Sequence, residues 1–277
     1  RVLFRSTLCK NFMFVDADIS DLSLKFINNI TDKYEFIQNT YKHNNNIKAV
    51  EITNENEFIE LIKKHKEFFI CTDERAIAEY LYKVLNDPEI KLITSETEDN
   101  DDLDLNQYKK VIYSPKIIYG LDCIKSHTVF TYYKETTINP RSMVQQIART
   151  RNIKKLYFYF EKKKFTEPKT NNFNDLKKTI ENKEKMTDII FNGLKKEYKY
   201  LNDMYIYLLC IFEYNLMAYK SNMRAHFINL LLNRGFKVEI NNNINIVDKK
   251  DRNNIIKEIK RSEEHTSELQ SHSFISY

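Results

Sequence analysis

A segment near the middle of the chain combines a helix start with amide and guanidinium side chains at regular spacing. Asn139 is a favourable helix cap and Pro140 suits the first helical turn. Gln145 and Arg149 lie four residues apart, so they share one face of a helix. Arg149 and Arg151 are candidates for the positive charge that phosphoryl transfer needs at the γ-phosphate of a nucleotide. The sequence therefore indicates a phosphate-binding helix end, with Gln145 as a polar partner.

A second group of polar residues follows the short apolar strand predicted at residues 111–113. Ser114 stands at the carboxyl end of that strand, where ligands bind in open α/β sheets, and its hydroxyl can donate to a phosphate oxygen. Gly120 follows six residues later and permits close backbone approach or a positive φ, and Asp122 comes next but one. The other interpretation is a strand, a turn and an ordinary capping aspartate.

Together these two groups resemble motifs V and VI of superfamily-two helicases, in particular the replication-origin-binding helicases of herpesviruses and other large DNA viruses. The resemblance implies that Ser114 contacts the DNA backbone, as the serine or threonine of motif V does in that family. It also implies that Gly120 and Asp122 contribute to nucleotide sensing.

Motif VI departs from the general superfamily pattern QRxGRxGR, because this chain reads QQIARTR from Gln145 onwards. Ala148 stands where glycine is usual, and the second arginine follows the first by two residues rather than three. The shortened form resembles the viral origin-binding branch. The resemblance makes Gln145 a nucleotide-binding residue and leaves open whether Arg149 or Arg151 is the catalytic arginine finger. A solvated basic helix face is the other interpretation.

Near the amino end, an apolar run at residues 12–15 leads into Asp16 and Asp18. The origin-binding helicases carry a similar Asp-Ala-Asp near motif III, which couples nucleotide state to the grip on DNA. Two residues apart in a strand, both carboxylates point to the same side. A metal-binding carboxylate pair is one alternative. Capping of the next helix by Asp18 or Ser20 is compatible with the motif III role.

Residues 68–74 look superficially like a Walker B strand with its Asp-Glu pair. No GxxxxGK[ST] loop precedes them, because all three glycines of the chain lie downstream. The segment better resembles motif IV, which opens the second helicase lobe, with Thr72 available to touch a DNA phosphate. The other interpretation is simply a capped helix start at Glu74.

Short apolar runs alternate with amphipathic stretches along most of the chain. Strands are predicted at residues 12–15, 47–52, 68–71, 90–93, 111–113, 128–133 and 156–160, with a small one at 236–240. Helices are predicted at 22–30, 55–65, 74–85 and 142–150, and helical periodicity returns from 173 to 233. The predicted fold class is therefore α/β: a parallel sheet flanked by helices, RecA-like by the resemblance, followed by a mostly helical accessory region.

Both ends are expected to be foreign to the natural protein. Residues 261–272 match a translation frame of a common sequencing adapter, and 273–277 fit its continuation. Residues 1–6 fit the reverse complement of the same adapter, so we expect 1–6 and 261–277 to be adapter-derived scars. A genuine polar tail is the alternative.

Between these ends, we expect residues 7–260 to be an internal piece of a longer protein. The resemblance assigns 7–30 to the end of a first RecA-like lobe and 31–165 to a second lobe. The helical pattern assigns 166–260 to an accessory region.

Composition permits nucleic-acid binding without demanding it, since the formal net charge is only +5 at pH 7. The four cysteines (Cys9, Cys71, Cys123 and Cys210) show no metal-ligand spacing, which predicts buried free thiols in a reducing, intracellular compartment. No apolar run approaches the length of a membrane span, about 18 residues, so no membrane partner is expected.

The resemblance implies a fragment of an ATP-dependent DNA helicase that acts at a replication origin, in the nucleus or a viral replication compartment. ATP and Mg²⁺ would be held mainly by a first lobe outside this chain, and no metal ligand is assigned here. Single-stranded and origin duplex DNA, with other replication proteins, are the implied partners. The alternatives are a non-catalytic DNA-binding RecA-like module and a lobe of another superfamily-two translocase.

Overall fold

The computed structural model describes residues 13, 21–97, 103–116, 121–161, 173–190 and 199–240. Side chains are not described at 21, 29, 183–190, 199–205, 218 and 221. Apart from Met13, the predicted strand at 12–15 lies outside the described residues, as do the candidate residues Asp16, Asp18 and Gly120 and both expected adapter-derived ends.

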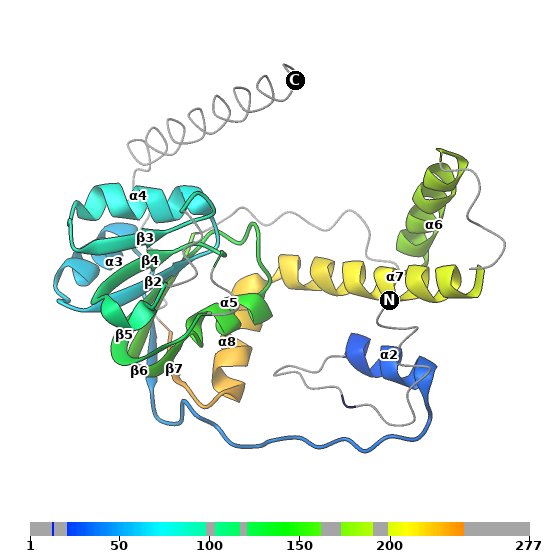
Figure 1. The fold of residues 1–277 in the computed structure, drawn as a ribbon, viewed down its shortest axis with the longest axis horizontal. Helices are drawn as coiled ribbons and strands as arrows, with labels where there is room; N and C mark the ends of the chain where they lie inside the picture. The colour runs from blue at the N-terminus through cyan, green and yellow to red at the C-terminus, as the bar shows by residue number, and fades with distance from the viewer. Residues whose placement is uncertain are drawn as a thin grey trace. The chain divides into compact units, whose positions relative to one another are not determined.

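A seven-stranded, all-parallel sheet forms the centre of the larger unit of the chain (Figure 1). The strands are β1 (Lys48–Glu51), β2 (Phe68–Thr72), β3 (Ile90–Ile93), β4 (Lys110–Tyr113), β5 (Cys123–Tyr133), β6 (Thr150–Phe160) and β7 (Lys237–Glu239). Their order is β3-β4-β2-β5-β6-β1-β7. The prediction of an α/β fold with a parallel sheet is therefore confirmed.

Helices cover both faces of this sheet (Figure 1). On one face pack α3 (Glu55–Lys63) and α4 (Arg75–Leu85), and on the other α5 (Pro140–Ile147) and α8 (Met223–Asn233). Side chains alternate between the two cores along each strand: Ile70 and Tyr132 face α3 and α4, whereas Phe69 and Tyr133 face α5 and α8. Burial on both faces explains why the strands read as apolar runs.

Strands β5 and β6 begin earlier than the sequence predicts, at Cys123 and Thr150 instead of 128 and 156. Their first halves are polar and largely exposed, so they carry little of the apolar signal by which strands are recognised. They form because each pairs with the other, with Cys123 in register with Thr150. This pairing extends β5 and β6 at the end of the sheet where the parallel strands begin.

The second unit contains α2 (Asp21–Ile30), α6 (Phe173–Ile190) and α7 (Lys199–Ser221). Its small core is made by Leu176, Ile180, Ile206 and Cys210. Cys71, Cys123 and Cys210 are buried free thiols, as predicted for them. Within the described ranges, no helix is long and apolar enough to cross a membrane.

Helix α8 and strand β7 belong to the sheet unit, although the sequence predicted that the accessory region would extend over 166–260. Strand β7 pairs with β1, and Phe227 of α8 is fully buried with its ring 5.3 to 5.6 Å from those of Tyr133, Phe158 and Phe160. The helical periodicity around α8 did not reveal which core the helix joins, because periodicity identifies an apolar face but not its partner.

Replacing Phe227 with alanine should lower the free energy of unfolding by about 3–5 kcal/mol, the usual cost of an emptied phenylalanine site. Leu232 lies on the same helix with 47% of its surface exposed, so Leu232→Ala should change stability by less than about 0.5 kcal/mol. Urea unfolding followed by circular dichroism measures both variants. Equal, small effects would contradict the placement of α8 in the sheet core.

Candidate functional site

Two arginines and one aspartate meet where β5 and β6 begin. A terminal nitrogen of Arg149 lies 3.0 Å from Oδ1 of Asp122, and a terminal nitrogen of Arg151 lies 2.6 Å from Oδ2. These are the residues that the motif V and motif VI resemblance singled out. Two guanidinium groups against one carboxylate leave a local charge of +1, because arginine stays protonated in proteins. The cluster therefore favours the approach of an anion.

The backbone around the cluster is braced by asparagine side chains. Asn106 accepts a hydrogen bond from the Ile124 amide at 2.9 Å, and Asn152 donates to the Ile124 carbonyl at 2.6 Å. The Cys123 amide donates to the carbonyl of Arg149 at 2.7 Å. These bonds fix the two strand starts to each other, so the carboxylate and the arginines are held at a set separation.

Helix α5, which carries the resemblance to motif VI, spans Pro140–Ile147 rather than the predicted 142–150. It ends at Ile147, and Arg149 lies in the turn that follows, because Thr150 already pairs as the first residue of β6. Ala148 has a φ of −67°, in the right-handed region, so this position does not require the glycine of the general motif. As predicted, Asn139 caps the helix: its side chain accepts from the Ser142 amide at 2.9 Å.

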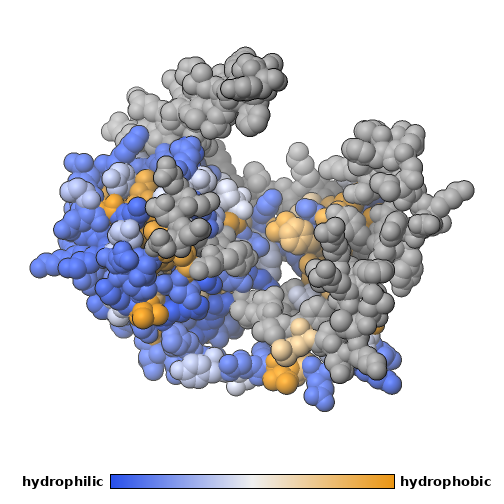
Figure 2. All heavy atoms as spheres, in the orientation of Figure 1, coloured by the Kyte–Doolittle hydropathy of each residue, from blue (hydrophilic) through white to orange (hydrophobic). Residues whose placement is uncertain are grey.

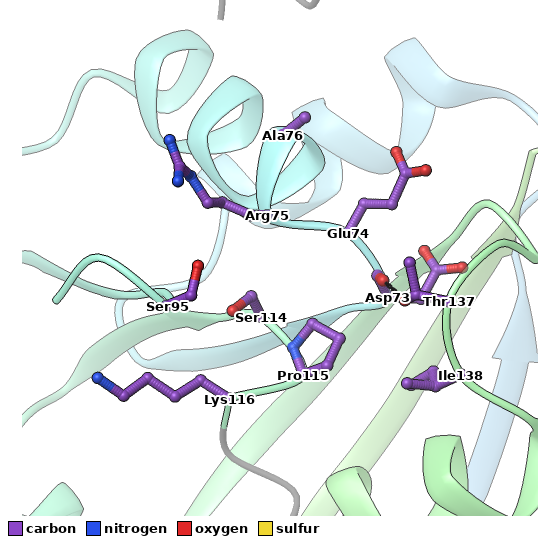
Figure 3. Close-up of a pocket in the computed structure, with 10 residues that line it drawn as sticks. All are labelled: Asp73, Glu74, Arg75, Ala76, Ser95, Ser114, Pro115, Lys116, Thr137 and Ile138. Atoms are coloured by element: carbon purple, nitrogen blue, oxygen red, sulfur yellow. Dashed lines mark hydrogen bonds between the residues drawn. The ribbon is translucent and has the colours of Figure 1, made fainter. Parts of the chain in front are cut away.

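A cavity of about 610 Å³ lies at the carboxyl ends of β2, β3, β4 and β5, at the opposite edge of the sheet (Figure 3). Its lining comes from the strand ends and the first turn of α4: Asp73, Glu74, Arg75, Ala76, Ser95, Ser114, Pro115, Lys116, Thr137 and Ile138. Ser114 is among them and directly follows β4, so its predicted place at a strand end is confirmed, although the residue is largely buried. The first turn of α4 also brings backbone N–H groups to this edge.

The two carboxylates of the cavity are already engaged within the protein. Asp73 is fully buried and accepts from the backbone amides of Lys134 at 2.8 Å and Thr136 at 3.0 Å. Burial raises the pKa of Asp73 above its ordinary value of 3.8, and these two amide bonds oppose the rise. Glu74 pairs with the ammonium of Lys134 at 3.2 Å. The negative charges of both carboxylates are therefore already partly offset within the protein, by amide donors at Asp73 and by an ammonium group at Glu74.

The predicted contact of Thr72 with a DNA phosphate does not fit the structure. Thr72 is fully buried, and its hydroxyl donates to the carbonyl of Glu74 at 2.9 Å and lies 3.4 Å from that of Tyr113. Thr72 is the last residue of β2, and its hydroxyl group bonds to the backbone within the protein. Its position at a strand end was read correctly, but its side chain turns into the protein.

Sequence reasoning selected Gln145 and missed its neighbour Gln146. Gln145 is half-buried, and the structure gives its side chain no contact with the arginine cluster among the described hydrogen bonds. Gln146 is fully buried, and its amide donates to the carbonyl of Thr72 at 3.0 Å. The available signal was its place between Met143 and Ile147 on the apolar stripe, where a polar residue needs buried partners.

Within the described ranges, no group of three or more histidine, cysteine, aspartate or glutamate residues is arranged to hold a metal ion. Figure 2 shows that the sheet unit presents a mostly hydrophilic surface in this view, with hydrophobic residues scattered singly. Scattered apolar residues of this kind are normal on a protein surface. The arginine cluster and the cavity beside Ser114 are therefore the two candidate functional sites.

No protein-family model and no curated protein matches the chain. Among solved structures, it is similar to S. cerevisiae Dbp5 bound to RNA and ADP BeF3, with a TM-score of 0.41, 14% identity and coverage of 54% of this chain and 44% of that one. It is also similar to the Pyrococcus furiosus Hef helicase domain, with a TM-score of 0.29, 13% identity and coverage of 39% and 26%. The chain thus spans less than half of either, and similarities this low carry no argument about activity.

The neighbouring glutamines provide a matched test of the site's construction. Gln146→Ala should lower the free energy of unfolding by about 1–3 kcal/mol, because the Thr72 carbonyl loses its buried donor. Gln145→Ala should change it by less than about 0.5 kcal/mol. Urea unfolding of both variants decides the matter, and the reverse order of effects would show that the side chain of Gln145 makes the buried contact.

Proposed function

We propose that the sheet unit is the second RecA-like lobe of an ATP-dependent, superfamily-two DNA helicase that acts in the initiation of replication. The observation that carries the proposal is the convergence of Asp122, Arg149 and Arg151. These residues are almost 30 positions apart in sequence at the extremes, they were selected only from motifs V and VI, and they meet at one edge of the sheet. An unrelated basic helix face would not place both arginines on the motif V carboxylate.

In the proposed reaction, water attacks the γ-phosphorus of ATP, the bond to the β–γ bridging oxygen breaks, and ADP leaves. Negative charge builds on the transferred group and on the leaving oxygen, and a guanidinium placed there stabilises it. Asp122 holds both guanidinium groups in place when no nucleotide is present. An arriving γ-phosphate competes with the Asp122 carboxylate for one of them, which makes the arginine cluster responsive to the nucleotide.

The cavity at the opposite edge supplies a site for the DNA backbone. Ser95 offers an exposed hydroxyl group, Lys116 offers positive charge, and the first turn of α4 offers backbone N–H groups. Ser114 adds a largely buried hydroxyl group, whereas Arg75 is already paired with Glu79 and Glu96. All of these groups can bind phosphate. We therefore propose sequence-independent contact with a DNA strand here, with any origin specificity residing elsewhere in the protein.

The Walker lysine and the Mg²⁺-binding carboxylates would come from a first lobe outside this chain. Reading the gene through both ends of the printed sequence tests this directly. A GxxxxGK[ST] loop followed by a DExx strand upstream of Thr7 is the expected result. An upstream region without such a loop would instead favour a non-catalytic DNA-binding module.

In the full-length protein, removing the arginine finger should lower DNA-stimulated ATP hydrolysis by a factor of about 10³–10⁵. Arg149→Ala and Arg151→Ala are measured side by side, and the larger loss identifies the finger. Arg141→Ala, in the first turn of the same helix, is the matched control and should retain most of the activity. If both cluster variants hydrolyse ATP like the control, the catalytic assignment is wrong.

For DNA binding, Ser114→Ala should weaken the affinity of the 277-residue chain for a single-stranded oligothymidine by about tenfold, the effect of losing one hydrogen bond to a charged phosphate. Ser142→Ala is the control, because Ser142 lies on α5 outside the cavity. Fluorescence anisotropy of the labelled oligonucleotide measures both. Equal affinities for the two variants would remove Ser114 from the DNA site.

A further inference from the structure

Tyr113, the last residue of β4, and Ser114, which follows it, point to opposite sides of the sheet. Ser114 is largely buried at the lining of the cavity, whereas Tyr113 is fully buried beneath α5 on the other side. Consecutive residues of an extended chain point in opposite directions, so this division follows from the strand geometry. Any displacement of the strand end at the cavity therefore also displaces the side chain of Tyr113.

The hydroxyl of Tyr113 reaches the backbone next to the arginine cluster. It donates to the carbonyl of Gln146 at 2.9 Å, and the same carbonyl accepts from the amide of Arg149 at 3.2 Å. The thiol of Cys71 donates to the Tyr113 oxygen at 2.9 Å, which fixes the hydroxyl from the other side. One carbonyl group thus separates the strand end at the cavity from the backbone of Arg149.

A second link connects the same helix turn to β2 and β5. The Gln146 amide donates to the carbonyl of Thr72 at 3.0 Å, and the Tyr133 hydroxyl lies 3.2 Å from the carbonyl of Met143 and 3.3 Å from Oε1 of Gln146. Gln146, Thr72, Tyr113 and Tyr133 are all fully buried. Burial raises the pKa of both tyrosines well above the ordinary value of 10.0, so their hydroxyls remain donors throughout the neutral range.

Polar groups in a buried network are costly to break, because no water replaces a lost bond. The strand ends and the last turn of α5 must therefore move together or lose several bonds at once. An apolar residue at 113 or 146 would pack the same space without this directional constraint. The network links the end of β4 at the cavity to the backbone of Arg149. A constraint on the relative position of these two parts therefore bears on both candidate sites.

We propose that Tyr113 and Gln146 are positioning residues that tie the placement of Arg149 to the occupancy of the Ser114 cavity. A nucleic-acid phosphate in the cavity shifts the end of β4, the Tyr113 hydroxyl carries the shift to the Gln146 carbonyl, and the Arg149–Asp122 pairing readjusts. This inference rests on the proposed function, because it takes the cavity occupant to be a DNA phosphate.

The test uses nuclear magnetic resonance on the 277-residue chain with a single-stranded oligothymidine as the probe. The Nε–H resonance of Arg149, identified by its loss in Arg149→Lys, reports the arginine, and the Ser114 and Arg75 amides report the cavity. In the wild-type chain the oligonucleotide should shift both sets of signals. In Tyr113→Phe, the cavity signals should still shift while the shift at Arg149 is lost.

Tyr132→Phe is the matched control. Tyr132 is an equally buried tyrosine near the end of β5, which β2 separates from β4, but its hydroxyl donates to Glu55 on the other face of the sheet, at 2.9 Å. This variant should behave like the wild type. Gln146→Met provides a second test variant should Tyr113→Phe lose its dispersed spectrum. It removes the side-chain bond to the Thr72 carbonyl but keeps the main-chain carbonyl that accepts from Tyr113, so it should reduce the shift at Arg149.

The outcomes separate the two proposals. Absence of oligothymidine binding would defeat the DNA-site proposal and this inference with it. Binding at the cavity without any change at Arg149 in the wild type would overturn the positioning role and leave the DNA site intact. Equal shifts at Arg149 in the wild type, Tyr113→Phe and Gln146→Met would also overturn it, since the network would then be structural only.

Discussion

The parallel pairing of β5 with β6 at their starting residues is the interaction on which the candidate site depends. The register places Cys123 opposite Thr150, and the Cys123 amide bonds to the carbonyl of Arg149. Asp122 immediately precedes one partner and Arg149 immediately precedes the other. The Asp122 carboxylate and the Arg149 guanidinium therefore meet because the backbone pairing of β5 and β6 places the two residues side by side. Shifting this register by one residue would turn the charged side chains to opposite faces.

The same strand geometry separates the two candidate sites. In an all-parallel sheet every strand ends at one edge, so Ser114 and the first turn of α4 gather around the cavity at the carboxyl edge. The arginine cluster stands where β5 and β6 begin, at the other edge. Helix α5 runs between them and its last turn touches both β2 and β4 through Gln146. A buried, hydrogen-bonded path thus connects the two edges within the sheet unit.

The sequence was sufficient to predict the sheet because its strands are buried on both faces and read as apolar runs. The motif spacing also singled out Asp122, Arg149 and Arg151, which the structure brings into contact. The sequence was not sufficient for Thr72 or Gln146, whose roles depend on whether a polar side chain at a strand end or helix face turns inward. Nor could periodicity assign α8 to the sheet, since the burial of Phe227 is decided by long-range contacts with β5 and β6.

The structure gives the unusual spacing of the two arginines a physical meaning. Arg149 and Arg151 flank Thr150, which is buried at 1% exposure as the first residue of β6. Arg149 is the last residue of the turn after α5, and Arg151 is the second residue of β6. Each of the two guanidinium groups bonds to one oxygen of Asp122. The shortened motif and the shared aspartate thus occur together at the start of β6, where the arginines on either side of buried Thr150 bond to the same carboxylate.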